Sequence, residues 1–456
     1  MATKCFSGKL LKQDLTCVVQ KRWAHNHHKF VIVGGGSAGI TIAHQIWNKF
    51  DANRNSALQD EERLKPGDIA IVDAAKYHYY QPGWTLAGAG LSSVAATRRE
   101  LASLVPAKFA LHPEYVSKLQ PGQNAVITKS ENVISYDYLV IAAGIHSAFE
   151  NIKGLTNSLD DSNVPVYTIY SEKYADSVFP AIKKLKTGKA IFTQPSGVLK
   201  CAGAPQKIMW MAEDYWSHHG VRNKINLVFK TGMPTLFSVK KYSDALERQN
   251  ETENRNVDLQ YKQELIEVRG RERIAVFKNK DTNDTYEEKF DFLHAVPPMT
   301  PHKFIAESEL ADASGFVAVD SATCQSTKFP NVFSLGDASG LPTSKTLQPL
   351  LPKHLYSLIT YGIMLTVENS MLSITGYSSC PLLTRYGKLI LAEFLYGGKP
   401  AETFGKWTSL LDQGTPRRLF YYLKKDFFPY VYWHTAMKNG RWYGSHGFIP
   451  PRFPND

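Results

Sequence analysis

Cysteine is scarce in this sequence, and its spacing excludes two common uses of the residue. The 456 residues include five cysteines, with no CxxC pair among them: Cys5, Cys17, Cys201, Cys324 and Cys380. Structural zinc sites need closely spaced ligand pairs, and small secreted scaffolds need a much higher density of cysteine. Any functional cysteines in this chain are therefore few and specific.

Long apolar runs are also missing, and so is any recognisable nucleic-acid-binding motif. No stretch of the sequence reaches the roughly 18 consecutive apolar residues of a membrane-spanning helix. The formal net charge is +11, but no nucleic-acid motif accompanies it. We therefore expect no nucleic-acid partner and no metal site, and the charge favours an anionic membrane surface or a small anionic substrate.

One glycine fingerprint for a dinucleotide is present where a two-nucleotide enzyme would carry two. Residues 29–39 read KFVIVGGGSAG, a strand that leads into the GxGxxG loop typical of pyrophosphate binding. A second buried strand, over 190–193, leads instead into QPSGVLKCAGAP, which contains Cys201 and no such loop. A single dinucleotide site favours FAD as the cofactor, reduced by a donor other than NAD(P)H.

The order of the expected elements predicts an α/β fold with tandem Rossmann-like units. The first unit covers 29–163, with a strand over 30–33, a helix over 37–50 and a strand over 68–72 that ends at Asp73. Asp73 stands where an acid bonds a ribose hydroxyl, although a solvated Asp would also fit that place.

The second unit is expected over 164–315, and the chain then returns to the first unit over 316–375. The second unit includes a helix over 205–219 directly after the Cys201 loop. In the returning segment a strand precedes Gly336-Asp337, where an acid can bond a ribityl hydroxyl. This split order is typical of flavoproteins with two dinucleotide-binding domains.

Residues 1–28 differ in composition from the centre of the chain. They carry five basic residues against one acid, Asp14, and can form an apolar helical face. Their apolar run is too short for a secretory signal, so the pattern predicts a mitochondrial targeting segment. The alternative is a disordered basic tail.

The last unit, 376–456, contains an aromatic segment that is mixed with basic residues. Residues 419–433 read LFYYLKKDFFPYVYW, with eight aromatics in fifteen residues, and Arg417, Arg418, Lys424 and Lys425 lie in or beside it. Such a pattern suits a helix that lies in the headgroup region of a membrane. An aromatic-rich core or a dimer contact is the alternative.

Cys201 and Cys380 have the surroundings of reactive thiols. Cys201 follows Lys200 and precedes a helix N-terminus, and both neighbours favour the thiolate. Cys380 lies in the small-residue turn GYSSCP, which leaves room for a substrate. Only the fold could bring the two together. Cys324, in ATCQS, is expected to be structural.

With these residues in view, the chain resembles the mitochondrial sulfide:quinone oxidoreductases of the wider flavoprotein disulfide reductase group. The resemblance covers roughly residues 28–445. Its most specific blocks are KCAGAPQKIMW at 200–210, YHYYQPGWTLAGAG at 77–90, VFSLGDASGLPTSKT at 332–346 and GYSSCPLLT at 376–384. Two cysteine blocks in this order are far more specific than one glycine fingerprint.

The resemblance implies a set of FAD contacts. The glycine loop would hold the cofactor through Gly34, Gly36, Ser37, Ala38 and Gly39, and Asp73 takes the position of the adenosine ribose ligand. Further flavin contacts are implied at Gln81, Val116, Gly144 and Asp337, with Lys345 and Thr346 near the isoalloxazine ring.

The resemblance also implies a reaction and a location. An oxidised bridge joins Cys201 and Cys380, either directly or through an extra sulfur, and hydrosulfide attacks Cys380 to leave a persulfide there. Cys201 departs as a thiolate and passes electrons to the flavin, the sulfur moves to glutathione or sulfite, and ubiquinone is reduced. The expected location is the mitochondrial inner membrane, with peripheral or monotopic attachment. The oligomeric state is left open.

The sequence departs from the family pattern after Lys345-Thr346. The family usually continues with small residues close to the flavin, whereas this chain reads LQPLLPKH over 347–354. Pro349 and Pro352 are tolerated only in the first turn of a helix, so the pocket for the flavin or the quinone is expected to differ here.

Two rival functions fit parts of the sequence. A type II NADH:quinone dehydrogenase would share the fold and the membrane segment but needs a second glycine fingerprint, which 194–203 does not supply. A non-catalytic membrane-bound flavoprotein would keep both cysteines without turning over a quinone.

Overall fold

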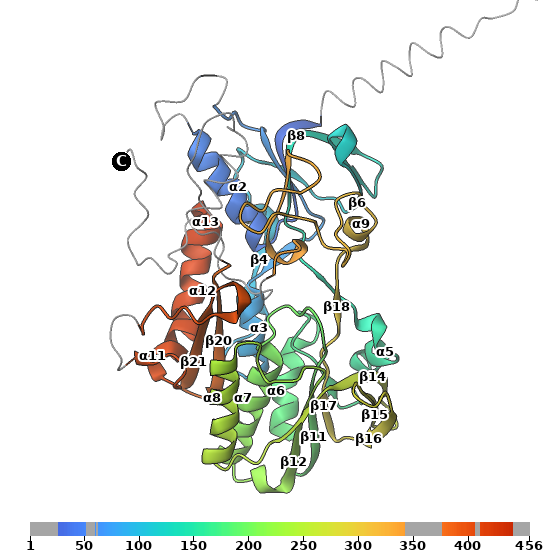
Figure 1. The fold of residues 1–456 in the computed structure, drawn as a ribbon, viewed down its shortest axis with the longest axis vertical. Coiled ribbons are helices and arrows are strands. Elements are labelled where there is room, and N and C mark those ends of the chain that lie inside the picture. Colours follow the sequence, from blue (N-terminus) through green and yellow to red (C-terminus); the bar gives the residue numbers. More distant parts are fainter. Residues whose placement is uncertain (1–25, 52–59, 61–62, 343–375, 406–410, 441–456) are drawn as a thin grey trace, which may run out of the picture.

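The computed structural model describes residues 26–51, 60, 63–342, 376–405 and 411–440. Residues 1–25 of the expected targeting segment, Lys345, Thr346, and the prolines at 349 and 352 lie outside the described residues. Figure 1 shows an elongated molecule with one sheet near each end and the C-terminal helix along one side.

The first sheet builds the glycine-loop unit from strands that are far apart in the sequence. Its order is β5-β2-β1-β8-β7-β6, and β19 pairs with β8. The strands are β1 (His27–Val33), β2 (Ile69–Val72), β5 (Ala110–His112), β6 (Val116–Gln120), β7 (Ala125–Thr128), β8 (Val133–Ile141) and β19 (Val332–Ser334). β19 follows the second sheet in the sequence but pairs in parallel with β8 of the first sheet. This is the split order that the sequence indicated.

β1 begins earlier than expected because β8 is long enough to pair with it. His27 and His28, the last two residues of the expected targeting segment, pair with Ser135 and Tyr136 of β8. The helix after the glycine loop, α2 (Ser37–Phe50), has the expected bounds. Buried apolar strands such as IAIV in β2 are typical of a parallel sheet covered on both faces.

The second sheet is parallel throughout and carries the Cys201 loop at one strand end. Its order is β10-β17-β11-β12-β13. The strands are β10 (Val166–Tyr167), β11 (Gly188–Gln194), β12 (Ile225–Thr231), β13 (Asp258–Tyr261) and β17 (Phe292–His294). The helices are α6 (Ala175–Lys184), α7 (Ala204–His218) and α8 (Lys240–Thr252), so α7 starts one residue before the expected helix.

Smaller elements join and flank these two units. The pair β9 (His146–Ser147) and β18 (Met299–Thr300) links the two sheets. The remaining described strands and α-helices outside the C-terminal unit are β3 (Tyr77–Tyr79), β4 (Arg98–Glu100), β14 (Gln263–Arg269), β15 (Ile274–Asn279), β16 (Thr285–Lys289), α3 (Trp84–Gly88), α4 (Leu101–Leu104), α5 (Leu155–Asp160) and α9 (Lys303–Ala306).

Residues 376–405 and 411–440, the described part of the C-terminal unit, form a hairpin and one long helix as their main elements. β20 (Ser378–Arg385) pairs with β21 (Lys388–Phe394). The helix runs through α11 (Arg418–Tyr422), a π-helical turn (Leu423–Phe427), α12 (Phe428–Val431), a second π-helical turn (Tyr432–Ala436) and α13 (Met437–Asn439). In Figure 1 this helix begins with α11, which lies beside strand β21 of the hairpin, and ends with α13, which lies beside α2.

The two π-helical turns give this helix an inward face that repeats every four residues. The inward positions are Phe420, Lys424, Phe428, Tyr432, Ala436 and Gly440, all buried except the half-buried Phe428. Five turns of an α-helix take 5 × 3.6 = 18 residues. Each π turn adds about one residue, which gives 18 + 2 = 20, the separation between 420 and 440. The inward face therefore stays aligned along the whole helix.

The opposite face of this helix is exposed and aromatic. Tyr422 and Tyr430 are 56% and 60% exposed, and Leu419 is 48% exposed. No helix within the described residues is long and apolar enough to cross a membrane.

Substitution of Gly39 should weaken the fold at the glycine loop. An added Cβ at Gly39 would lie 1.9 Å from the carbonyl oxygen of Gly34, a backbone atom that cannot yield without separating α2 from β1. We expect Gly39→Ala to lower the free energy of unfolding by about 1–3 kcal/mol, measured by denaturant unfolding. Gly36→Ala is the matched control, because no atom lies within 4 Å of its added Cβ. Equal stability of the two variants would contradict this account.

Candidate functional site

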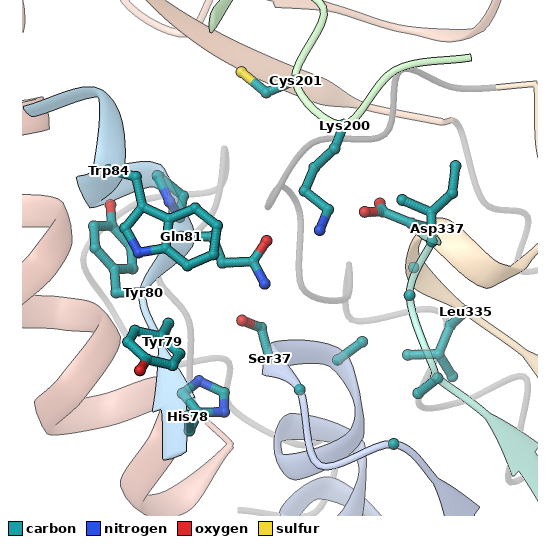
Figure 2. Close-up of a pocket in the computed structure, with 18 of the residues that line it drawn as sticks. Ser37, His78, Tyr79, Tyr80, Gln81, Trp84, Lys200, Cys201, Leu335 and Asp337 are labelled. Carbon is teal, nitrogen blue, oxygen red and sulfur yellow. The ribbon is translucent and has the colours of Figure 1, made fainter. Parts of the chain in front are cut away.

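A cavity of about 540 Å³ runs between the glycine loop and the Cys201 loop. Nine of the expected site residues line it: Gly34, Gly36, Ser37, Ala38, Asp73, Gln81, Gly144, Cys201 and Asp337. Figure 2 shows Ser37 and Cys201 in different parts of this cavity, with Lys200 and Asp337 directed toward one another between them. One continuous cavity thus joins the dinucleotide loop to a thiol.

Three expected contacts do not line the cavity. Gly39 instead packs α2 against Gly34. Val116 begins β6, where it pairs with Thr128 of β7. Its contact with the flavin stays a prediction. Cys380 does not line the cavity, whereas its two neighbours, Ser379 and Pro381, do.

The glycine loop is built for a close approach of backbone and ligand. Gly34 has φ +107°, and an added Cβ there would lie 2.5 Å from the carbonyl oxygen of Ala142. Gly36 precedes α2 and has no side chain with which to occupy the first amides of the helix. Those amides and the helix dipole form a place for an anion such as a pyrophosphate.

Asp73 fixes the glycine loop as well as lining the cavity. Its carboxylate accepts hydrogen bonds from the backbone amides of Gly35, at 2.6 Å, and Ala75, at 2.8 Å. A carboxylate has further lone pairs available for a ribose hydroxyl. The ribose contact stays a prediction.

The fold brings Cys201 and Cys380 together. Their sulfur atoms lie 3.8 Å apart, and both are free thiols. Cys201 sits in the loop between β11 and α7 in a left-handed conformation, with φ +53°. Gly203 makes room for the pair, because an added Cβ there would lie 2.7 Å from the Cys380 sulfur.

Two buried lysines set the charge around the thiols. Lys207, on α7, is 2% exposed and donates a hydrogen bond of 3.2 Å to the Cys201 sulfur. Lys424, from the C-terminal helix, is 3% exposed and lines the cavity. Burial, together with repulsion from Lys207, lowers the pKa of Lys424 to about 7.

These neighbours make the two cysteines unequal. The hydrogen bond from Cys380 and the charges of Lys207 and Lys424 hold the pKa of Cys201 well below its usual range, although burial opposes this. The hydrogen bond to Cys201 and burial raise the pKa of Cys380 well above its usual range. In the reduced pair, Cys201 therefore carries the negative charge and Cys380 keeps its proton.

Cys324 is a third free thiol among the described residues, and its surroundings are different. It is 1% exposed and lies in the core of the first sheet, although it also borders the cavity. Burial and the nearby Asp320 raise its pKa to about 12, so it stays a neutral thiol.

Two lysines of the site, Lys207 and Lys424, were not predicted from the sequence. Lys207 lies inside the KCAGAPQK block but was not singled out. Lys424 was taken for a basic residue of a membrane-facing helix, and this was wrong, because its side chain is buried beside the thiols. The aromatic segment combines a buried face with an exposed one. Phe420 and Tyr432 belong to the core, whereas Tyr422 and Tyr430 face outward.

Three comparisons relate the chain to known proteins. A family model for pyridine nucleotide-disulphide oxidoreductases matches residues 28–176. The chain is 64% identical to the mitochondrial sulfide:quinone oxidoreductase of Schizosaccharomyces pombe, over 95% of both chains. It is 39% identical to the mitochondrial sulfide:quinone oxidoreductase of Dictyostelium discoideum, over 98% of this chain and 93% of that one.

A solved structure shares the fold. The sulfide:quinone oxidoreductase of Aquifex aeolicus matches with a TM-score of 0.68 at 18% identity, covering 91% of this chain and 92% of that one. This likeness confirms the expected α/β, Rossmann-like flavoprotein fold. The mitochondrial designation of both relatives agrees with the expected localisation.

Loss of the Lys207 charge should change the acidity of Cys201. Without the ammonium, the Cys201 thiolate loses a stabilising charge and a hydrogen bond, so its pKa should rise in Lys207→Met. The measurement is the pH dependence of iodoacetamide alkylation of the reduced protein, mapped to each cysteine by mass spectrometry. Lys425→Met is the control, because Lys425 pairs with Asp426 at 2.8 Å instead. An unchanged alkylation profile in Lys207→Met would refute the assignment.

Proposed function

The chain belongs to the mitochondrial sulfide:quinone oxidoreductase family, and on this premise we propose that it oxidises hydrosulfide with the Cys201–Cys380 pair and FAD. The electrons pass to ubiquinone, and the sulfur passes to a small nucleophile such as glutathione or sulfite. One observation carries the proposal: two thiols far apart in sequence lie 3.8 Å apart beside a buried ammonium, next to the cavity that reaches the glycine loop.

The residues present fit FAD. The glycine loop offers amides and a close backbone approach for the pyrophosphate, while Asp73 and Asp337 offer carboxylates for ribose and ribityl hydroxyls. Residues 29–163 with 316–375 would form the FAD-binding domain, and 164–315 the domain that carries Cys201. When bound, FAD supplies the two-electron chemistry that links a thiol pair to a quinone.

The unequal thiols fix the direction of the first step. Starting from the oxidised Cys201–Cys380 bridge, the hydrosulfide sulfur forms a bond to the Cys380 sulfur, and the bridge bond breaks. Cys201 leaves with the electron pair as a thiolate, which Lys207 stabilises from 3.2 Å. A thiol with a low pKa leaves faster, so attack at Cys380 is the favoured direction.

The second step removes the sulfur and restores the bridge. The acceptor nucleophile attacks the outer sulfur of the Cys380 persulfide, and the bond between the two sulfurs breaks. The Cys380 sulfur leaves with the electron pair and takes up the persulfide proton, so it ends as a neutral thiol. Re-formation of the bond between the two cysteines would release the Cys380 proton and two electrons, for which bound FAD would be the acceptor. The two lysines hold the negative charge of the pocket through both steps.

Reduction by NADH is disfavoured at the second sheet. In a two-nucleotide enzyme the loop after β11 would bind a pyrophosphate. Here the amide of Ser196, in this loop, donates to both carboxylate oxygens of Glu264, each at 3.1 Å. A carboxylate in this position would repel a pyrophosphate. This arrangement supports the thiol pair, and not NADH, as the donor to FAD.

Loss of either cysteine should stop turnover but not FAD binding. We expect Cys201→Ser and Cys380→Ser to keep bound FAD and to lose sulfide-dependent reduction of decylubiquinone by at least about a thousandfold, because a serine cannot form the bridge. The assay is run anaerobically with glutathione or sulfite as the acceptor, and flavin bleaching by sulfide and by NADH is recorded.

Two results would decide against the proposal. Near-normal turnover in both variants would favour a non-catalytic or differently reduced flavoprotein. Rapid bleaching of the flavin by NADH alone would favour the NADH:quinone dehydrogenase.

The exposed face of the C-terminal helix is the proposed membrane contact. Tyr422 and Tyr430 are among the most exposed large hydrophobic side chains of the described residues, and Arg418 and Asp426 are exposed in the same row at four-residue spacing. Aromatic side chains beside basic ones favour the headgroup region of a bilayer. Phe428, on the inner side, lines the cavity, so the helix separates the cavity from the proposed membrane surface.

Charge on this face should release the protein from membranes. We expect Tyr422→Asp combined with Tyr430→Asp to reduce binding to vesicles of anionic phospholipid at least about tenfold, measured by co-sedimentation. Tyr115→Asp is the control, because Tyr115 is 62% exposed but precedes β6 of the first sheet. Equal loss of binding in the control and the double variant would remove the helix from the contact.

A further inference from the structure

The C-terminal helix reaches the glycine loop through one buried hydroxyl. The Tyr432 side chain is fully buried, and its Oη lies 2.5 Å from Ser37 Oγ and 2.5 Å from His78 Nε2. His78 Nδ1 lies 2.9 Å from the carbonyl oxygen of Gly35. A chain of hydrogen bonds thus connects a residue of the last described helix with two residues of the dinucleotide loop.

The donor and the acceptor of each hydrogen bond in this series can be assigned from the Gly35 carbonyl and the His78 ring. A carbonyl oxygen only accepts, so His78 Nδ1 carries a proton and donates it to Gly35. Burial lowers the pKa of His78, which leaves the ring neutral and Nε2 as an acceptor. Tyr432 therefore donates to His78, and the Tyr432 oxygen accepts from the Ser37 hydroxyl.

The loop is consequently held through both polar backbone groups of Gly35. The carbonyl of Gly35 accepts from His78, while the amide of Gly35 donates to Asp73 at 2.6 Å. The hydroxyl of Ser37 is committed to Tyr432, so the backbone amides at the start of α2 are what remain for a pyrophosphate. Their directions are set before any ligand arrives, which lowers the cost of ordering on binding.

The same helix also grips α2 farther along. Gln45 Nε2 donates to the carbonyl of Gly440 at 2.8 Å, and Asn48 Nδ2 donates to the carbonyl of Asn439 at 3.0 Å. Side chains of α2 thus satisfy carbonyls at the end of the C-terminal helix. The two helices are joined at the first turn of α2 and again at its middle.

We propose that Tyr432 is a positioning residue for the FAD loop and that the C-terminal helix acts as a latch on the bound cofactor. Tyr432 acts through Ser37 and His78 and does not touch the ligand. The inference rests on the proposed FAD site. It extends the role of the helix from membrane contact to retention of the cofactor.

The test compares two tyrosines on the same helix. Tyr432→Phe removes the hydroxyl of the relay, whereas Tyr430→Phe removes a hydroxyl from the exposed face. The release of FAD from the holoenzyme is followed in detergent by the gain in free-flavin fluorescence after dilution. We expect FAD release about tenfold faster in Tyr432→Phe, since two hydrogen bonds that order the loop are lost. Tyr430→Phe should match the unaltered chain.

A double variant separates a relay from a general loss of stability. Ser37→Ala removes the other hydroxyl, so it should also speed FAD release. If the relay exists, Tyr432→Phe combined with Ser37→Ala releases FAD no faster than the worse single variant. Effects that multiply fully in the double variant would overturn the relay, even if Tyr432→Phe alone lowers the thermal midpoint.

The remaining outcomes are distinct. Equal rates of FAD release in Tyr432→Phe and Tyr430→Phe would overturn the latch while leaving the proposed function intact. Purification of the unaltered chain without FAD, and without uptake of added FAD, would instead overturn the proposed function itself.

Discussion

A buried ammonium beside a half-buried thiolate is the interaction on which the rest of this structure depends. Lys207 is buried and Cys201 is half-buried, and the ammonium would not be stable there without the thiolate. The pair exists because the loop after β11, the first turns of α7 and the strand β20 meet at one point. Because Gly203 has no side chain, these elements pack closely enough for the Cys380 sulfur to lie 3.8 Å from the Cys201 sulfur.

The same constraint explains why one helix serves several parts of the molecule. Lys424 brings a second positive charge to the thiols from a segment more than two hundred residues along the chain from Lys207. Four residues later Phe428 lines the cavity, and after another four Tyr432 reaches the glycine loop. Its exposed tyrosines meanwhile face away from all three. The thiol site, the cavity and the dinucleotide loop therefore share one supporting element.

Local patterns in the sequence were sufficient for much of the fold. The glycine loop, α2 and the apolar strands follow from glycine geometry and hydrophobic runs. The bounds of α2 agree with the structure, whereas β1 begins three residues earlier than expected. The two cysteine blocks identified the reactive thiols through the family resemblance. The distance between their sulfurs could not be foreseen, because it depends on how α7 packs against β20.

Other parts of the site had no local signal. Lys424 stands among aromatic and basic residues, a composition that a membrane-facing helix would share. Only the four-residue spacing of the buried side chains distinguishes the two faces, and a search at the α-helical period of 3.6 does not find it. His78 and Tyr432 are likewise joined only by the tertiary fold.

The two π-helical turns make the length of the C-terminal helix as important as its composition. An ordinary α-helix advances about 100° per residue, so deletion of a single residue between Lys424 and Tyr432 would rotate everything after it by that angle. The hydrophobic content would hardly change, yet Tyr432 would leave His78 and an exposed side chain would turn inward. This segment can therefore accept exchanges of one aromatic residue for another more readily than it can gain or lose a residue. Pro429 has no amide proton to donate to the Lys425 carbonyl. It therefore favours the wider π-helical turn just before it, which keeps Tyr432 in register with His78.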